Sequence, residues 1–323
     1  MLVAAPAWAD CSNKAPLVGV NLAGAEFASN KLPGTVNVDY VYPDPVDMRL
    51  FHSQGMNTFR LPVLWERLQP RLFAELNQAE LQQIKKVIST ARELDACVVL
   101  DIHNYAKYRD QVIGSAAVPE AAFLDLWTRL ATQFSGENGL AFDLMNEPAA
   151  MKIADWTKLA QRAVVEIRKT GSKNLVLVSG GRWSGAHEWS KPFDGLSNAE
   201  ALANFHDPAR NYAIEVHQYA DTDFSGTKTE CVNPQRLETI MAEISSWSVK
   251  YKQPLFLGEF GTSNSQACLV ALGAIIAPMK SKTVWRGWTY WASGRWWGNY
   301  PLSIQPGVNG EMMPQMKVLS TIL

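Results

Sequence analysis

Two glutamates in this sequence each follow a short apolar segment. Glu147 follows the run 140–145 and is preceded by Asn146, while Glu259 follows the run 254–258. Apolar runs of this length are typical of strands buried in a parallel sheet. A carboxylate at the end of such a strand is costly to remove from water, which indicates a functional role. Two carboxyl groups at the same end of one sheet can hydrolyse a glycosidic bond, because one protonates the leaving oxygen and the other stabilises or attacks the anomeric carbon.

Five polar residues at or after apolar runs are candidates to support the two acids. Arg60 can keep the attacking carboxylate ionised, and Tyr219 can donate a hydrogen bond to it. Asn146 can contact the sugar 2-hydroxyl, a contact that strengthens in the transition state. His103 and His217 can bind sugar hydroxyls or orient the carboxylates. The acid that must stay protonated needs a raised pKa, which burial or a negative neighbour can supply.

Tryptophan is abundant, with 12 residues in the chain, five of them between 285 and 297. So dense a cluster beside a predicted strand favours a surface on which flat sugar rings stack, with polar side chains around it to bind hydroxyls. The residues predicted to contact substrate are Asn21, Asn104, Tyr105, Trp183, Trp291, Trp296 and Trp297.

Other ionisable residues have more limited expectations. Asp101 and Asp143 lie inside predicted strands and are expected to pair with neighbouring barrel residues. Glu215 faces the same way as His217, because side chains alternate along a strand. It is expected to be a partner of Arg60 or an acid behind the site. Glu26 is expected to line the cleft, with a role that the sequence leaves open. Structural roles are expected for His52, His187 and His206.

Strand-like and helix-like segments alternate along the whole chain, and these elements must position the candidates. The predicted strands are 18–21, 58–63, 98–102, 140–145, 175–178, 212–216, 255–257 and 285–291. The predicted helices are 46–54, 81–94 with a capping box at Asn77 and Glu80, 121–134, 153–167, 198–205, 234–247, 268–279 and 316–322. Eight such repeats predict an α/β fold, a single-domain (β/α)8 TIM barrel, in which functional residues gather at the carboxyl ends of the strands. A doubly wound sheet is the alternative, but no Gly-x-Gly-x-x-Gly follows the first strand.

Composition excludes several classes of partner. The 323 residues carry a net charge of -1, which provides no basic field for nucleic acid. No apolar run reaches the roughly 18 residues that a membrane helix needs, so no membrane partner is expected. No spacing of Cys and His resembles a zinc site, and neither a metal nor another cofactor is expected.

The first residues and the cysteines indicate export. Ala7-Trp8-Ala9 has the small-x-small form of a signal-peptidase site, so 1–9 is predicted to be the remnant of a secretion signal and 10–323 the catalytic domain. A start without structure is the alternative. Cys231 and Cys268 lie in polar surroundings and are the expected disulfide of an exported protein. Cys97 is expected to be a buried free thiol, and Cys11 lies in the leader region.

The full set of motifs resembles the glycoside hydrolase family 5 cellulases over essentially the whole chain. The residues that carry this resemblance are, in order, Arg60, His103, Asn146-Glu147-Pro148, His217-x-Tyr219, Glu259 and Trp291. The segments 19–26 and 101–105 are similar to the endo-β-1,4-glucanases that bacteria and fungi share, and the positions of Cys231 and Cys268 also fit that group. The resemblance implies that Glu147 is the general acid/base, that Glu259 is the nucleophile, and that Trp291 is the floor beneath the sugar at the cleaved bond.

The expected protein is therefore a secreted, monomeric, retaining endo-β-1,4-glucanase that acts on cellulose or cello-oligosaccharides, with its two carboxyl groups about 5 Å apart. The same chemistry on mannan, xyloglucan or mixed-linkage glucan is the nearest alternative, because loop contacts to the sugar decide between these substrates. A carbohydrate-binding barrel without catalysis is a more distant alternative. A barrel enzyme that handles phosphate would need glycine-rich turns after the last two strands.

Overall fold

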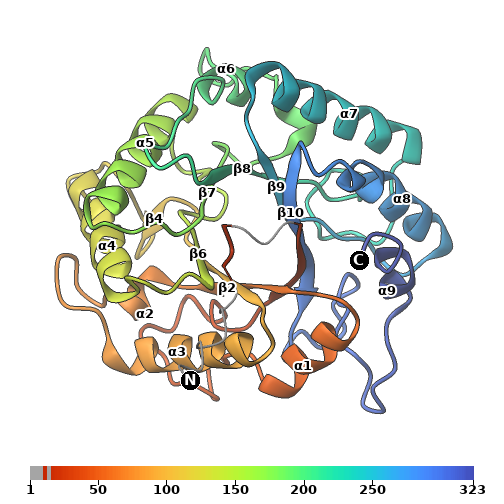
Figure 1. The fold of residues 1–323 in the computed structure, drawn as a ribbon, viewed down its shortest axis with the longest axis horizontal. Helices are drawn as coiled ribbons and strands as arrows, with labels where there is room; N and C mark the ends of the chain where they lie inside the picture. Colours follow the sequence, from red (N-terminus) through yellow and green to blue (C-terminus); the bar gives the residue numbers. More distant parts are fainter. Residues whose placement is uncertain (1–9, 13–15) are drawn as a thin grey trace, which may run out of the picture.

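Parallel strands form a closed barrel at the centre of the molecule, and helices surround it (Figure 1). The computed structural model describes residues 10–12 and 16–323. The predicted remnant of a secretion signal, 1–9, lies outside the described residues. The barrel strands are β1 (Leu17–Leu22), β2 (Thr58–Val63), β3 (Cys97–Ile102), β6 (Leu140–Asp143), β7 (Val176–Ser179), β8 (Tyr212–His217), β9 (Leu255–Glu259) and β10 (Trp285–Ser293).

Helical segments connect successive barrel strands, and one more helix follows the last strand. They are α1 (Pro45–Ser53), α2 (Trp65–Leu68), α3 (Gln78–Glu93), α4 (Glu120–Gln133), α5 (Ile153–Lys169), α6 (Asn198–Ala201), α7 (Pro234–Tyr251), α8 (Gln266–Ile276) and α9 (Pro314–Leu319), with short 3-10 turns η1 (Ala186–Glu188) and η2 (Ala277–Lys280). Around the barrel the order is β1-β10-β9-β8-β7-β6-β3-β2, so each strand pairs with the next barrel strand of the sequence. The predicted single-domain (β/α)8 barrel is confirmed.

The barrel interior changes from apolar to charged along strands β3 and β8. At the amino-terminal end, Val99 of β3 and Ala213 of β8 belong to an apolar cluster inside the barrel. Two residues further along the same strands are Asp101 and Glu215, which are also fully buried. Because side chains alternate along a strand, residues two apart face the same side. The barrel therefore carries a layer of buried charge directly beneath its carboxyl end.

Some local elements differ from the prediction. Asn77 accepts a hydrogen bond from the Ala79 amide at 3.0 Å and caps α3, but no capping box forms. Glu80 instead accepts hydrogen bonds from the phenols of Tyr40 and Tyr42. The expected helix 198–205 is the single turn α6. Unpredicted elements are α2 and the hairpin of β4 (Lys107–Tyr108) and β5 (Gln111–Val112).

The cysteines form two disulfides. Cys231 and Cys268 are bonded, with their Cα atoms 5.3 Å apart, and this bond joins the loop after β8 to α8. The expected free thiol at Cys97 is wrong, because Cys97 is bonded to Cys11 at a Cα separation of 5.7 Å. Cys97 opens β3 at the amino-terminal end of the barrel. Cys11 lies at that end, where its amide donates to the Asn138 carbonyl at 3.0 Å.

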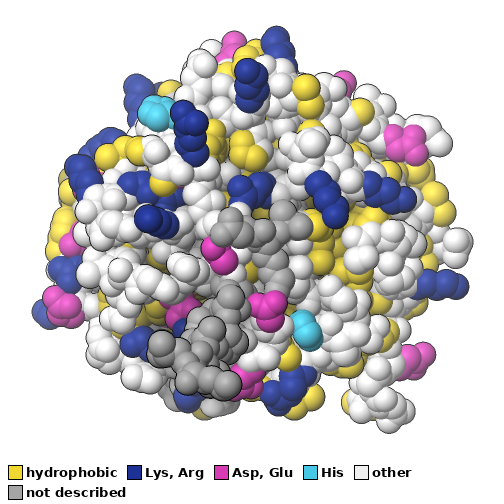
Figure 2. Space-filling model, in the orientation of Figure 1, with side chains coloured by type: hydrophobic (Ala, Val, Ile, Leu, Met, Phe, Trp, Pro, Cys, Tyr) yellow, Lys and Arg dark blue, Asp and Glu magenta, His cyan; other side chains and the backbone are white. Residues whose placement is uncertain are grey.

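The surface carries both signs of charge. On the face shown in Figure 2, Lys and Arg side chains are interspersed with Asp and Glu rather than gathered into one field. None of the helices in the described part of the chain has the length and apolar character that a bilayer crossing demands.

Replacing both Cys231 and Cys268 with Ser is expected to lower the free energy of unfolding by about 3 to 4 kcal/mol, because the bond spans 37 residues whose freedom it restricts in the unfolded chain. Urea unfolding of the oxidised proteins measures the difference. The matched pair Cys11→Ser and Cys97→Ser removes a bond that spans 86 residues, so it is expected to lose about 4 to 5 kcal/mol. Unfolding curves that coincide with the parent curve would contradict both values.

Candidate active site

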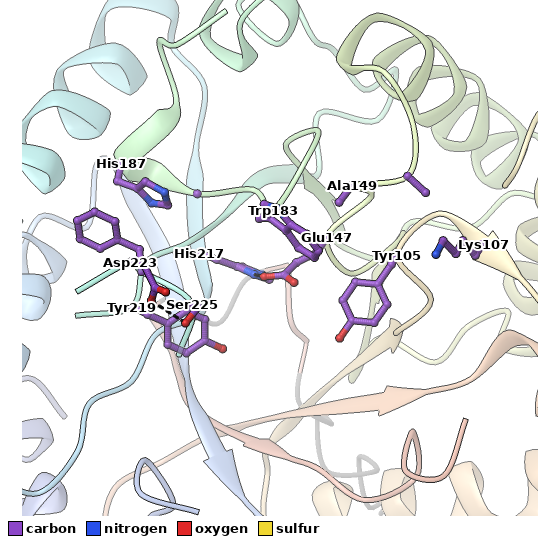
Figure 3. Close-up of a pocket in the computed structure, with 13 residues that line it drawn as sticks. Tyr105, Lys107, Glu147, Ala149, Trp183, His187, His217, Tyr219, Asp223 and Ser225 are labelled. Carbon is purple, nitrogen blue, oxygen red and sulfur yellow. Dashed lines mark hydrogen bonds and ion pairs between the residues drawn. The ribbon is translucent and has the colours of Figure 1, made fainter. Parts of the chain in front are cut away.

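A cleft of about 730 Å³ opens at the carboxyl ends of the strands. Figure 3 shows Glu147 and His217 together in the middle of this cleft, between two walls. The labelled residues of these walls are Tyr105 and Lys107 on one side and His187, Tyr219, Asp223 and Ser225 on the other. The cleft therefore reaches one of the two candidate acids directly.

Glu147 and Glu259 face each other across His217. One carboxylate oxygen of each glutamate and one ring nitrogen of His217 lie within 4.8 Å of one another. His217 Nδ1 is 2.9 Å from Glu147 Oε1 and 3.6 Å from Glu259 Oε2. This separation of the two carboxyls corresponds to the roughly 5 to 5.5 Å of retaining glycosidases and leaves no room for the intervening water of inverting ones. The same three groups are close enough to hold a cation, although the hydrogen bond between His217 and Glu147 already uses one ligand atom of each.

The backbone at Glu147 is unusual. Strand β6 ends at Asp143, earlier than predicted, and Glu147 takes a φ of +42°. This left-handed region is uncommon for residues other than glycine and is often found at functional sites. The turn is held by the Asn146 amide, which donates to the Ile102 carbonyl at 2.9 Å, and by the Tyr105 amide, which donates to the Asn146 carbonyl at 3.2 Å.

Arg60 connects Glu259 to the site. Its Nη1 donates to Glu259 Oε1 at 2.8 Å and to Asn21 Oδ1 at 2.9 Å. Its Nη2 donates to Asn146 Oδ1 at 3.0 Å. Tyr219 donates its phenol proton to Glu259 Oε2 at 2.6 Å. Both oxygens of Glu259 are therefore held by donors that favour its ionised form.

The same guanidinium contacts three further carboxyl groups below Glu259. Arg60 Nε donates to Asp143 Oδ2 at 2.9 Å and lies 3.4 Å from Glu215 Oε1, while Nη2 is 3.1 Å from Asp101 Oδ2. Burial alone would lower the pKa of Arg60, but Asp101, Glu215, Asp143 and Glu259 hold that pKa well above its ordinary value. Arg60 is therefore a permanent cation at the centre of the site.

The environment separates the two glutamates electrostatically. Burial raises the pKa of Glu147, and the opposing effect of the His217 hydrogen bond does not reverse this. Burial also acts on Glu259, but His217 and Arg60 outweigh it and lower its pKa. The side chain of Glu147 is 15% exposed and that of Glu259 is 4% exposed. The arrangement thus favours the protonated form of Glu147 at the cleft and the ionised form of Glu259 behind it.

His103 is placed between the acids and the aromatic side chains. Its Nδ1 is 2.7 Å from Asp101 Oδ2, and its Nε2 is 3.2 Å from both the Tyr105 hydroxyl and Asn146 Nδ2. Its ring stacks on Trp291 at a centroid distance of 5.5 Å. His103 therefore orients Asn146 and supports the indole of Trp291.

The predicted stacking residues fall into different environments. Trp183 is 49% exposed and lines the cleft, with its ring 6.2 Å from that of Tyr105. Trp291 is only 8% exposed, and Trp297 packs against it at 5.9 Å and on Tyr300 at 4.4 Å. Trp296 is 41% exposed and is not among the residues that line the cleft. Of this set, Trp183 and Tyr105 offer the most accessible ring faces to a ligand in the cleft.

Two predicted substrate contacts do not reach the cleft. Asn21 is fully buried and its Nδ2 points at the carbonyls of Gly258, Thr289 and Tyr290, so the side chain holds Arg60 rather than a ligand. Asn104 is also buried. Its Oδ1 accepts from the Trp65 amide and its Nδ2 donates to Glu66, both at 2.7 Å. The expectation of substrate contact is corrected for both residues, because their amides are bonded within the protein.

The wall opposite Tyr105 contains residues that the sequence analysis did not select. His187, expected to be structural, lines the cleft and stacks on Phe224 at 4.4 Å. The guanidinium carbon of Arg236 also lies over the Phe224 ring, 4.7 Å from its centroid. Asp221 fixes the loop by accepting hydrogen bonds from the amides of Gly226, Thr227 and Lys228. The run of polar residues after strand β8 is the sequence feature that could have indicated that this loop lines the cleft.

Comparison with known proteins agrees with this geometry. Endo-beta-1,4-glucanase B of Aspergillus niger is 31% identical over 307 residues, which cover 94% of this chain and 89% of that protein. The endo-beta-1,4-glucanase Xac0029 of Xanthomonas axonopodis pv. citri has a crystal structure with a TM-score of 0.92 and 45% identity, covering 95% of this chain and 98% of that one. The structure of XacCel5A in complex with cellopentaose has a TM-score of 0.93 and 46% identity, with 95% and 99% covered.

One family model accounts for most of the chain. Residues 20–294 match the model of Cellulase (glycosyl hydrolase family 5). This range begins within β1 and ends just after β10, so it contains the second half of β1 and all the other barrel strands, together with Arg60, Glu147 and Glu259. The match over most of the sequence, together with the relatives above 30% identity, means that this chain belongs to the cellulase family, glycosyl hydrolase family 5.

Proposed function

We propose that this protein is a retaining endo-β-1,4-glucanase in which Glu147 is the acid/base and Glu259 the nucleophile. The observation that carries this proposal is the pair of carboxyl groups within 4.8 Å of each other, one at the cleft and one fixed by Arg60 and Tyr219. Two acids at this distance support a double displacement. The endo-β-1,4-glucanases among its relatives support the choice of reaction.

The proposed reaction has two steps. Glu259 attacks the anomeric carbon and forms a covalent bond to it, while Glu147 gives its proton to the departing glycosidic oxygen. Glu147, now ionised, then takes a proton from a water molecule, whose oxygen attacks the same carbon and releases Glu259. The proton returns to Glu147, so each cycle consumes one water and leaves the enzyme unchanged. Two inversions at one carbon retain its configuration.

The surrounding residues favour this division of roles. Arg60 and Tyr219 hold both oxygens of Glu259 before substrate arrives, which removes the cost of arranging them during the reaction. Asn146 is held by Arg60 and His103, and we propose that its amide binds the sugar 2-hydroxyl. The predicted floor, Trp291, is supported from below by His103.

A cellulose segment is the proposed substrate. The accessible faces of Trp183 and Tyr105 suit the flat faces of β-linked glucose units, and the cellopentaose complex of XacCel5A supports a cello-oligosaccharide ligand. A mannan, a xyloglucan or a mixed-linkage glucan is the alternative. Release of reducing sugar from carboxymethylcellulose, with galactomannan in parallel, distinguishes these substrates. We further propose that 10–323 is the catalytic domain of an exported monomer, which two disulfides support.

The change Glu259→Ala is expected to lower kcat on cellopentaose by roughly 10⁴-fold or more, because no other group can form the covalent intermediate. Binding of cellopentaose, measured by titration calorimetry, is expected to remain. Glu238→Gln, on the exposed side of α7, is the matched control and should keep parental activity. Ordinary turnover by Glu259→Ala would refute the assignment.

The anomer released first reports the stereochemistry. Because the carboxyl groups lie too close together for an inverting water, the new reducing end is expected to appear as the β-anomer and to equilibrate later. Proton NMR of an early time course on cellopentaose measures this. An α-anomer at the first time points would reassign Glu259 as a base.

The pH profile of kcat/KM is expected to be bell-shaped. Activity rises as Glu259 ionises, below the usual glutamate pKa of 4.5 because its pKa is lowered, and falls as Glu147 loses its proton above 4.5 because its pKa is raised. In Glu147→Gln, assayed with an aryl cellobioside whose leaving group needs no proton, the first step should keep the acidic limb and lose the basic limb. A basic limb that persists in this variant would assign it to another group.

A further inference from the structure

One buried carboxylate beside the proposed catalytic pair has no part in the reaction as described so far. Glu215 lies on β8, two residues before His217, and is fully buried. Its Oε1 is 3.4 Å from Arg60 Nε and 3.5 Å from His217 Nε2. Its Oε2 lies 2.7 Å from Ser179 Oγ, whose single hydroxyl proton is shared between Glu215 and the Met145 carbonyl at 2.6 Å. Glu215 thus faces the two basic side chains that contact the catalytic glutamates.

The backbone leaves room for this carboxylate directly before the proposed nucleophile. A Cβ atom on Gly258 would lie 1.7 Å from Glu215 Oε1 and 2.5 Å from its Cδ. A side chain at 258 would therefore displace either Glu215 or the backbone that carries Glu259. The glycine ties the position of one carboxylate to that of the other.

His217 lies between Glu215 and the catalytic pair. Its Nε2 faces Glu215, while its Nδ1 is 2.9 Å from Glu147 Oε1 and 3.6 Å from Glu259 Oε2. A neutral imidazole has one protonated nitrogen and one acceptor nitrogen. A carboxylate oxygen lies near each nitrogen, at hydrogen-bond distance from Nδ1 and at ion-pair distance from Nε2, and both contacts stabilise a proton on the nitrogen. The geometry therefore favours the imidazolium form.

We propose that Glu215 is a positioning residue that, through His217, keeps a proton-bearing nitrogen between Glu147 and Glu259. The proposal rests on the function proposed above, because it assigns a role within the same site. Burial alone would lower the pKa of His217, but Glu259, Glu147 and Glu215 together raise it well above its usual 6.5. His217 in turn opposes the effect of burial on both catalytic glutamates: the pKa of Glu147 stays raised, because burial is the larger effect there, and that of Glu259 is lowered.

The ionisable groups around His217 come from several strands. They are Glu147 after β6, Glu259 on β9, Glu215 on β8 and Tyr219 after it, with Arg60 of β2, Asp143 of β6 and His103 after β3 beyond these. The pKa values of the two acids nearest Arg60 Nε are shifted in opposite directions. Burial and Glu215 raise the pKa of Asp143 well above its usual range. Burial acts on Glu215 too, but Arg60 and His217 lower its pKa to about 2.

The test is the titration of His217 in enzyme labelled with ¹⁵N-histidine, without substrate. The His217 ring signals are identified by their loss in His217→Gln. In Glu215→Gln, which keeps the shape of the side chain but removes its charge, the midpoint is expected to fall by about one to three pH units. On cellopentaose, kcat should fall roughly 10- to 100-fold with little change in KM, because Glu215 acts on the reacting groups and not on the substrate.

Two further variants separate this role from a merely structural one. Asp143→Asn is the control, because it also replaces a fully buried carboxyl that is bonded to Arg60. Asp143 has no bond to His217, so the His217 midpoint should stay at its parental value. Ser179→Ala releases Glu215 Oε2 and should lower the midpoint in the same direction by a smaller amount. Thermal unfolding shows whether Glu215→Gln folds. If it does not, the His217 midpoint in Ser179→Ala tests the proposal.

A His217 midpoint shared by the parent, Glu215→Gln and Ser179→Ala overturns the proposal, whatever their activities. An equal fall in Asp143→Asn overturns it as well, because any buried carboxyl near Arg60 would then have the same effect. The titration needs no turnover. Its failure is therefore distinct from failure of the proposed function, which would appear as a parental enzyme that does not hydrolyse cellopentaose.

Discussion

The guanidinium of Arg60 lies fully buried among four carboxyl groups, and both the fold and the chemistry depend on this contact. An unpaired buried ion costs several kcal/mol even after the protein relaxes around it, so neither the cation nor its partners are tolerable alone. The charge that compensates Asp101 inside the barrel also keeps Glu259 ionised. Stability and the proposed nucleophile are therefore consequences of one interaction, and selection on either acts on both.

The rest of the barrel serves to place this charged layer. Apolar side chains fill the amino-terminal half of the interior, and the inward positions become polar only two residues before the cleft. The charged layer lies next to the apolar core, where the dielectric response is weak. This strengthens each ion pair and separates the pKa values of Glu147 and Glu259. The same residues in a solvated loop would titrate alike and could not divide the roles of acid and nucleophile.

Most of the architecture was predictable because local sequence carries it. Buried parallel strands and amphipathic helices leave a period that can be read over a dozen residues, and the barrel rule then selects strand ends. That rule does not tell which way a strand-end amide turns. Asn21, Asn104 and Asn146 look alike in sequence, and all three amides are bonded to other segments, but only that of Asn146 lies between Arg60 and His103. The pairing of Cys97 depended on a residue 86 positions away, which no local pattern reports.

The unequal exposure of the two glutamates affects the second half of the proposed reaction. A molecule that enters the cleft meets Glu147 first, beside the open ring faces of Trp183 and Tyr105. While the glycosyl group is attached to Glu259, whichever hydroxyl rests beside Glu147 becomes the acceptor. Water in that place gives a shorter glucan, and another sugar gives a longer one. Under the proposed mechanism, the contacts of Trp183 and Tyr105 with an incoming sugar would therefore set the balance between degradation and transglycosylation.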